Sequence, residues 1–335
     1  MTDNNDAVLV DSFGRKITYL RLSVTDRCNL RCFYCMPQAD FNWMPQENVL
    51  RFEEITTLVR VLARLGIRKV RLTGGEPLVR NNVLKLIEDI SRIAGIREIC
   101  ITTNGVVLPD MTDRLVTLGV RHINISLDTL KRDKFEEITG RDLFDRVWNG
   151  IEKCLEADIP CLKINFVMIR GRNHDEIADF AMLTRQLPVE VRFIEFMPIG
   201  KGSNWGEQFF YPSDKALEQI EKRAGKLVRK ERTAFSGPAE LYRFQDGRGS
   251  IGFISPLSHR FCNECNRLRI TADGRLRLCL FSDIEMDLRQ MLRTGINDED
   301  LAAFFMDAVK TKPARYMART QNLPSCNRRM SSIGG

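Results

Sequence analysis

The chain has 335 residues, with 51 Lys and Arg against 44 Asp and Glu, and 43% hydrophobic residues. This composition is typical of a globular protein of about two domains and excludes a disordered chain. No apolar run approaches the ~20 residues of a membrane-spanning helix, and the polar, acidic start of the chain is unlike a secretion signal. We therefore expect a cytoplasmic protein with no membrane partner. Its net charge of +7 suggests an anionic ligand or a nucleic acid without deciding between them.

From residue 17 to about 197, short β-rich runs alternate with amphipathic helical patterns. The expected strands are 17–24, 68–73, 97–103, 122–127, 160–169 and 190–196. The expected helices are 53–65, 83–94, 110–118, 144–157 and 174–186. Strands that alternate with helices imply parallel pairing through right-handed crossovers. Because a complete eight-unit barrel takes about 250 residues, we expect an α/β fold with an incomplete barrel or an open sheet.

Polar residues occupy alternate positions in several of the expected strands, and period-two alternation puts each set on one face. These sets are Arg21 and Ser23; Arg71 and Thr73; Asn124, Ser126 and Asp128; Lys163 and Asn165. A closed barrel fills its interior with Val, Ile and Leu. The pattern therefore favours a curved sheet around a polar ligand cavity.

The Gly-rich segment 198–206 is the best candidate for a domain boundary. We predict an N-terminal extension over 1–16, the partial barrel over 17–200 and an α+β region over 201–335. Helices are expected near 213–224, 283–293 and 298–310, and the stretch from Lys312 to Gly335 resembles a polar tail.

Ten cysteines are too many to ignore in a chain expected to be cytoplasmic, where disulfides are rare. Cys100, Cys154 and Cys161 are interpreted as core residues. Another three, Cys28, Cys32 and Cys35, form C-x3-C-x2-C directly after the first strand, where parallel α/β folds place active sites. Three thiolates can hold three irons of a four-iron cluster and leave one iron open. A structural zinc site would need a fourth ligand, and none lies nearby in the sequence.

A second group, Cys262, Cys265 and Cys279, has the spacing C-x2-C-x13-C. The spacing alone fits an iron–sulfur cluster and a zinc site completed by His259 or Cys326 equally well. Five arginines and two acids lie between Arg260 and Arg277, and arginine is suited to phosphate oxygens. A zinc protein that binds RNA here is an alternative, although the stretch has one aromatic residue, Phe261.

The first cysteine loop, with Tyr34 before its last cysteine, and Thr73-Gly74-Gly75-Glu76-Pro77 resemble the radical S-adenosylmethionine (SAM) superfamily, whose members share a partial (βα)6 TIM-like barrel. The second triad, Arg267-Leu268-Arg269 and the terminal Gly334-Gly335 extend the likeness. With them, nearly the whole chain resembles the GTP 3′,8-cyclase family of molybdenum cofactor (molybdopterin) biosynthesis.

The resemblance implies two [4Fe–4S] clusters, held by Cys28, Cys32 and Cys35 and by Cys262, Cys265 and Cys279. It implies SAM contacts at Tyr34, Gly75, Ser126 and Met197. It implies GTP contacts at Arg21, Arg71, Thr102, Lys163, Arg267, Leu268 and Arg269. The first cysteine triad, Arg267 and Arg269 would be the catalytic residues.

The implied reaction begins when a SAM-derived 5′-deoxyadenosyl radical abstracts hydrogen from ribose C3′ of GTP. C3′ then attacks guanine C8, giving (8S)-3′,8-cyclo-7,8-dihydroguanosine 5′-triphosphate. The implied partners are an electron donor of the reductase or flavodoxin type and a downstream cyclic pyranopterin monophosphate synthase. A homodimer is possible, and no nucleic acid is expected. The alternative is another radical SAM enzyme with an auxiliary cluster, such as a peptide-modifying enzyme.

Overall fold

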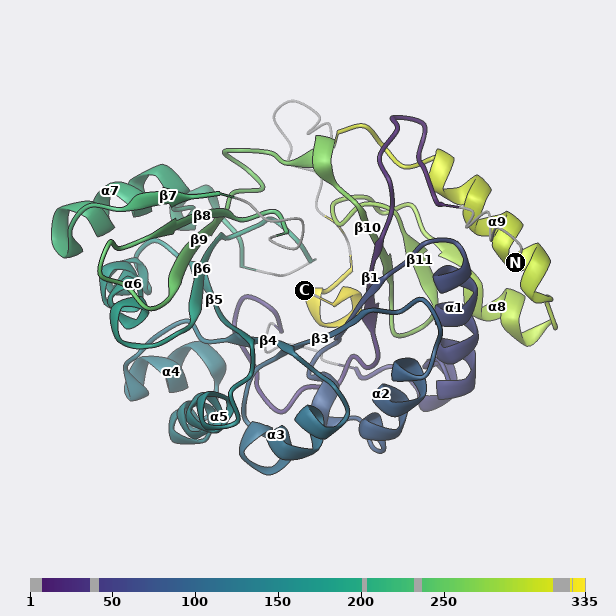
Figure 1. Ribbon diagram of the computed structural model, residues 1–335, viewed down its shortest axis with the longest axis horizontal. Helices are drawn as coiled ribbons and strands as arrows, with labels where there is room; N and C mark the ends of the chain where they lie inside the picture. Colours follow the sequence, from purple (N-terminus) through teal and green to yellow (C-terminus); the bar gives the residue numbers. More distant parts are fainter. Residues whose placement is uncertain are drawn as a thin grey trace, which may run out of the picture.

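The protein is described here by a computed structural model that covers residues 8–36, 42–200, 204–231, 237–315, 326 and 328–334. Its strands form one sheet in the order β12-β11-β10-β1-β2-β3-β4-β5-β6-β9-β8-β7. The sheet curves around a central space, and the helices cover its outer face (Figure 1). No helix of the described residues is long and apolar enough to cross a membrane.

The six expected strands are confirmed, and neighbours in chain order pair in parallel. They are β1 (Tyr19–Ser23), β2 (Lys69–Thr73), β3 (Glu98–Thr103), β4 (His122–Ser126), β5 (Cys161–Met168) and β6 (Glu190–Glu195). The expected helices between them are also present: α1 (Phe52–Arg64), α2 (Val83–Ser91), α3 (Leu108–Thr117), α5 (Phe144–Glu156) and α6 (Ile177–Gln186). Short 3-10 helices are η1 (Gln46–Asn48), η2 (Pro77–Val79), η3 (His174–Glu176), η4 (Glu207–Phe209) and η5 (Cys262–Glu264).

One helix of this region was not predicted from the pattern. Helix α4 (Arg132–Thr139) has eight residues and buries only Phe135, Ile138 and Thr139. Two apolar residues in so short a segment do not establish a helical period. Gly140 ends α4 with a left-handed φ of 67°, as is common at the residue after a helix.

The C-terminal region extends the same sheet at both edges. Strand β9 (Ser250–Ile254) pairs in parallel with β6, and β10 (Arg267–Ile270) pairs in parallel with β1. Antiparallel strands continue beyond them: β8 (Glu240–Arg243) and β7 (Val228–Lys230) on one side, β11 (Arg275–Arg277) and β12 (Met286–Asp287) on the other. The partial barrel is therefore widened to eight consecutive parallel strands, and a domain boundary at residue 200 stays a prediction.

Helices α7 (Ser213–Ala224) and α9 (Asp298–Lys310) lie where they were expected. The helix expected over 283–293 begins later, as α8 (Leu288–Arg293), because Met286 and Asp287 pair with β11. The Asp287 side chain then accepts a hydrogen bond from the Gln290 N–H over 2.9 Å and caps α8.

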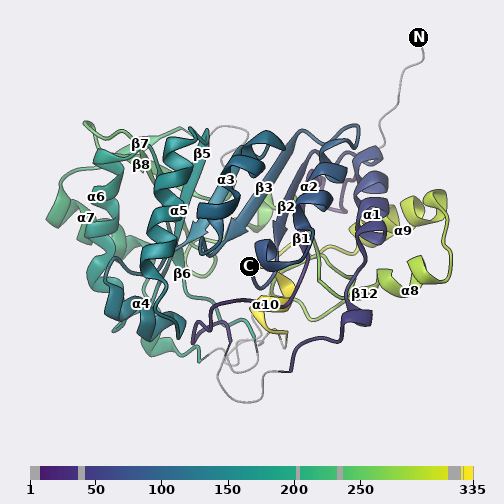
Figure 2. The same ribbon diagram turned by 90° about the horizontal axis from the view of Figure 1, so that it is seen from below.

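The last described residues of the tail, Cys326 and 328–334, pack inside the molecule. Helix α10 (Met330–Ile333) lies within the curve of the sheet, beside β1 (Figures 1 and 2). Cys326 and Ile333 are fully buried and pack with Ile199. The tail was expected to be polar and without periodicity, so its pattern did not predict this packing.

Candidate active site

The first cysteine triad lies on the loop that follows β1. The N–H groups of Cys35 and Met36 both donate to the Cys32 carbonyl, over 2.9 and 2.8 Å, and make a tight turn. The loop is held from outside because Arg31 and Phe33 donate their N–H groups to carbonyls at the end of α4. Helix α4, which the sequence pattern did not predict, therefore supports this loop through two backbone hydrogen bonds.

The glycine pair after β2 packs directly on the cysteine loop. Gly75 N–H donates to the Thr25 carbonyl and Glu76 N–H to the Arg27 carbonyl, each over 2.8 Å. A Cβ on Gly75 would lie 2.3 Å from the Arg27 carbonyl oxygen. Only glycine permits this approach.

The sulfur atoms of the first triad suit an iron–sulfur cluster. Burial raises the pKa of Cys28 to about 11 and that of Cys35 to about 12, and burial together with the two neighbouring cysteines raises the pKa of Cys32 well above its ordinary value. The Leu30 N–H and the Asn104 amide donate to the Cys28 sulfur over 3.4 and 3.6 Å. Three crowded, partly buried thiols, one of which receives two N–H donors at its sulfur, need a cationic partner to ionise, which a bound iron cluster supplies.

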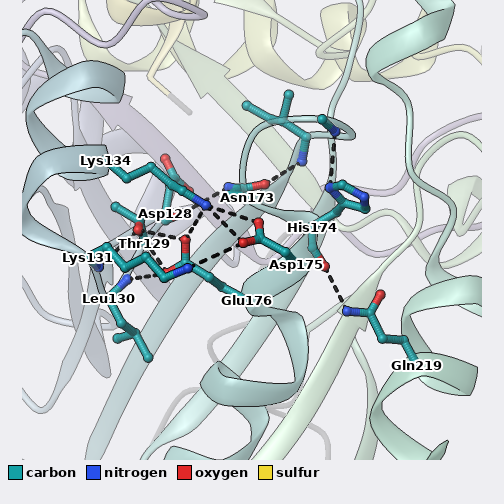
Figure 3. A network of polar contacts seen from close by, with 12 residues as sticks. Asp128, Thr129, Leu130, Lys131, Lys134, Asn173, His174, Asp175, Glu176 and Gln219 are labelled. Carbon is teal, nitrogen blue, oxygen red and sulfur yellow. Dashed lines mark hydrogen bonds and ion pairs between the residues drawn. The ribbon is translucent and has the colours of Figure 1, made fainter. Parts of the chain in front are cut away.

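A buried polar network fixes the wall beside this loop. The Tyr34 hydroxyl donates to Asp128 Oδ2 over 2.5 Å, and the Val167 N–H donates to Asp128 Oδ1 over 2.8 Å. The Asn173 amide then bonds the Asp128 carbonyl over 2.9 Å. Figure 3 shows how the next residues continue the network through Thr129 and Leu130 to the buried Glu176. The turn after β4 is therefore rigidly held.

A cavity follows the inner face of the sheet, and its charged lining is cationic. The lining cations are Arg15, Arg21, Lys69, Arg71, Lys163, Arg192, Arg260, Arg267, Arg269 and Lys312. No acidic side chain of the described part of the chain lines it. The cavity thus attracts a polyanion, and the expected polar interior is confirmed.

Three of these arginines form a row across neighbouring strands. Arg21 on β1 is in register with Arg71 on β2 and with Arg269 on β10. Burial lowers the pKa of Arg269 to about 9, with Arg21 and Arg267 adding repulsion. The Nε atoms of Arg21 and Arg269 are buried and lack a hydrogen-bond partner among the described residues. Crowded cations with unused donors are suited to phosphate oxygens.

The opposite wall carries Lys163 and Arg192. Glu190 accepts hydrogen bonds from both, over 2.9 Å in the case of Lys163. Gly252 on β9 faces Arg192, where an added Cβ would lie 3.4 Å from Arg192 Cγ. Arg192 was missed in the sequence, although it occupies an alternate position of the expected strand 190–196.

The second cysteine triad lines the cavity at its other end. Cys262 and Cys265 precede β10 and Cys279 follows β11, which places them at the end of the sheet where β1 begins. Because the first triad follows β1, a strand of five residues separates the two groups, roughly 17 Å at 3.3 Å per residue.

This second triad lies in a positive environment. Burial opposes ionisation of Cys265, but Arg267 and Lys312 lower its pKa to about 6. The Lys312 ammonium is buried and donates to the Arg267 carbonyl over 2.8 Å, and Arg15 donates to the Cys262 carbonyl over 2.7 Å. The thiolate form of Cys265 is therefore favoured, as a metal ligand requires. No sequence signal marked Lys312.

The remaining predicted residues are placed as follows. Thr102 and Met197 line the cavity, whereas Tyr34, Gly75 and Ser126 are not among its lining residues. The Leu268 side chain is buried in the hydrophobic core, so only its backbone can face a ligand.

The two uncertain ligands of the second group lie elsewhere. The Cys326 sulfur accepts from Arg277 over 2.9 Å, and His259 pairs with Asp214 over 2.9 Å. His122 also borders the cavity.

Family models match most of the chain. Residues 22–184 match the radical SAM superfamily, and residues 189–318 match the family described as Molybdenum Cofactor Synthesis C. A solved structure, Streptococcus suis SuiB bound to S-adenosylmethionine, matches with a TM-score of 0.60 over 92% of this chain and 70% of that chain. Its 14% sequence identity supports the fold alone.

Curated relatives match over nearly the full length. GTP 3′,8-cyclase of Pelotomaculum thermopropionicum is 45% identical, over 97% of this chain and 99% of its own. GTP 3′,8-cyclase of Moorella thermoacetica is 47% identical over the same shares. Membership of the radical SAM superfamily implies a [4Fe–4S] cluster and SAM. The chain belongs to the GTP 3′,8-cyclase family of radical SAM enzymes.

Proposed function

We propose that this chain is a GTP 3′,8-cyclase that makes (8S)-3′,8-cyclo-7,8-dihydroguanosine 5′-triphosphate for molybdenum cofactor biosynthesis. One observation carries the proposal, and it concerns a single cavity lined by cations. The second cysteine triad lines one end of this cavity, and the first cysteine triad lies beyond the other end. A nucleoside triphosphate that spans such a cavity can be held at both ends while its ribose lies between them.

The first triad would hold the cluster that binds SAM, with Tyr34, Gly75, Ser126 and Met197 around the SAM molecule. When bound, the cluster and SAM together supply the radical that abstracts hydrogen from ribose C3′. The Gly75 contact with the Arg27 carbonyl keeps both loops at a fixed distance. The chain's own task here is to orient SAM and to exclude water.

The triphosphate would bind the row of Arg21, Arg71 and Arg269, with Arg267 beside the row and Lys163 on the opposite wall of the cavity. Each guanidinium offers donors in a fixed fork that matches phosphate oxygens. Thr102 lies next to the row, since Arg71 donates to its hydroxyl over 3.4 Å and to the Ile101 carbonyl over 2.9 Å. The backbone of Leu268 would complete this group of contacts.

The second triad would hold a second [4Fe–4S] cluster near the guanine ring. The positive side chains of Arg267 and Lys312 support thiolate ligands at this place. Cys326 and His259 have other partners, so a zinc site completed by either of them has less support.

The reaction also needs partners outside the chain. We infer a reductase or flavodoxin-type electron donor, because GTP itself supplies no electron for SAM cleavage. The product would pass to a cyclic pyranopterin monophosphate synthase. A homodimer and a cytoplasmic location stay predictions from the sequence.

Anaerobic reconstitution followed by incubation with SAM, dithionite and GTP tests the proposal. We expect about eight irons per chain and 5′-deoxyadenosine that forms only when GTP is present. Cys265→Ala should retain about four irons and give no cyclic product, whereas the control Cys161→Ala, outside the cavity lining, should match the parent protein. Zinc at the second triad, or 5′-deoxyadenosine formation that requires a peptide, would contradict the proposal.

A further inference from the structure

Asn124 has a buried hydrogen-bond acceptor with no partner. It lies in the middle of β4, is 5% exposed and lines the cavity. Its Oδ1 atom has no hydrogen-bond partner among the residues that the structure describes. A buried acceptor left unpaired costs about 1–3 kcal/mol. The atom is therefore placed for a donor that arrives with a ligand.

The neighbours of Asn124 belong to the proposed GTP site. Asn124 is in register with Thr102 on β3 and with Lys163 on β5. The surrounding cationic side chains only donate hydrogen bonds, and the phosphate oxygens of GTP at neutral pH only accept them. An acceptor among these donors cannot pair with the triphosphate. Among the groups of GTP, Oδ1 can accept only from the donors of the nucleoside, which are the ribose hydroxyls and the N1–H and 2-amino groups of guanine.

The position of Asn124 along β4 separates the ribose from the base. Ser126, the proposed SAM contact, lies two residues further along the same face, about 6.6 Å away at 3.3 Å per residue. The cysteines proposed to face guanine lie at the other end of the cavity. Since ribose C3′ must face SAM, the layer directly below Ser126 is the ribose layer.

We infer that Asn124 is a specificity-determining residue whose Oδ1 accepts a hydrogen bond from a ribose hydroxyl of GTP and so orients C3′ toward SAM. The inference rests on the proposed function. Under this inference Asn124 recognises the ribose, whereas the arginines and Lys163 recognise the phosphates.

The test is a set of dissociation constants, measured by anaerobic calorimetry with GTP, 2′-deoxy-GTP, 3′-deoxy-GTP and inosine triphosphate. The parent protein should bind one deoxy analogue about tenfold more weakly than GTP, since a lost hydrogen bond is worth about 1–1.5 kcal/mol. Asn124→Leu should bind GTP about tenfold more weakly and should no longer distinguish that analogue from GTP. It should still distinguish inosine triphosphate, which lacks the 2-amino group.

Two further variants separate recognition of the sugar from general weakening. Asn124→Asp retains acceptor oxygens, so it should keep the discrimination while its negative charge weakens binding of every triphosphate. Lys163→Met should weaken all four nucleotides by a similar factor and leave their ratios unchanged. Unaltered SAM affinity shows that each variant is folded.

Three results are decisive against these ideas. Asn124→Leu with the parent's discrimination against both deoxy analogues would overturn the inference. Loss of discrimination against inosine triphosphate alone would place guanine, and not ribose, at Asn124 and would also overturn it. A parent protein that binds none of the four nucleotides would overturn the proposed function itself, a result that differs from either of the others.

Discussion

The Tyr34 hydroxyl donates a hydrogen bond to Asp128 over 2.5 Å, and this contact joins the first cysteine loop to the end of β4. Burial raises the pKa of Asp128 to about 6, against the effect of the bonds from Tyr34 and Val167. The carboxylate is thus still ionised at neutral pH, and its bond to Tyr34 is charge-assisted. One buried contact fixes where the loop stands relative to the barrel wall.

Tyr34→Phe and Asp128→Asn should each weaken SAM binding about ten- to a hundredfold, because a hydrogen bond to a charged group contributes about 1.5–3 kcal/mol. The double variant should lose little more than either single variant, since both remove the same contact. Anaerobic titration of SAM into the reconstituted protein measures these constants. The matched control is Tyr211→Phe, which removes a hydroxyl bonded to Gln219 over 2.7 Å. Additive losses in the double variant would disprove the coupling.

The parallel strands and most of the helices were predictable because the apolar residues of each element repeat at a regular spacing within one short segment. The added strands were not, since β10 has four residues and meets β1 across some 250 positions of the chain. The row of Arg21, Arg71 and Arg269 exists only through that pairing. Long-range pairing of short strands leaves no periodic signal, so the charges could be identified from the sequence but their alignment could not.

In the candidate site, too, features within one short segment could be predicted from the sequence, and features that depend on distant segments could not. Cys28, Cys32 and Cys35 were predictable as a group because they share one loop. The unpaired oxygen of Asn124 was not, since pairing depends on what the neighbouring strands bring. Lys312, buried beside the second triad, lies in a segment without any period.

Arg269 and Arg277 are opposite each other on β10 and β11 and should respond oppositely to replacement by Met. Arg269 is crowded by Arg21 and Arg267, so Arg269→Met should leave the nucleotide-free protein as stable or more stable by about 1 kcal/mol. It should also abolish stabilisation by GTP. Thermal unfolding with and without GTP measures both effects.

Arg277 is fully buried and pairs with Glu285. Arg277→Met should therefore lower the stability by about 1–3 kcal/mol, because it removes the hydrogen bonds that the buried guanidinium donates to Glu285 and to the Ser282 carbonyl, although Glu285 keeps its ion pair with Arg328. A fall in stability for Arg269→Met comparable with that for Arg277→Met would show that the arginine row is structural and is not held ready for phosphate.

Gly334 lies where the tail meets the barrel. Its φ is +80°, and an added Cβ would lie 1.9 Å from the Thr73 hydroxyl oxygen. Gly334→Ala should displace α10 from Ser23 and Thr73 and lower the rate of cyclisation at least tenfold. We expect it to expose the tail to proteolysis, which mass spectrometry of trypsin fragments can follow.

Gly295→Ala is the matched control for this change. Its φ of +86° carries the same backbone strain, but no atom lies within 4 Å of the added Cβ. Each variant should lose about 1 kcal/mol from the backbone, and only Gly334→Ala should also lose activity. Equal activity in both variants would mean that the fit of the tail against Thr73 is not needed for turnover.

Glu195 links the end of β6 to the loop that leads into the second cysteine triad. Its buried carboxylate accepts the N–H groups of Leu257 and Ser258 over 3.0 and 3.1 Å and that of Ser213 over 3.2 Å. Glu195→Gln replaces one acceptor oxygen with an amide nitrogen that faces these donors. We expect a loss of about 2 kcal/mol in stability, the cost of buried donors left unpaired.

The loss should be concentrated at the second triad, because Ser258 lies four residues before Cys262. Brief treatment of the reconstituted Glu195→Gln protein with a chelator should reduce its iron from about eight to about four per chain, while SAM affinity stays that of the parent. Glu218→Gln, an exposed change on α7, should retain its iron under the same treatment. Equal retention in both variants would separate Glu195 from the second triad, and iron lost equally from both triads would assign it to the stability of the whole barrel.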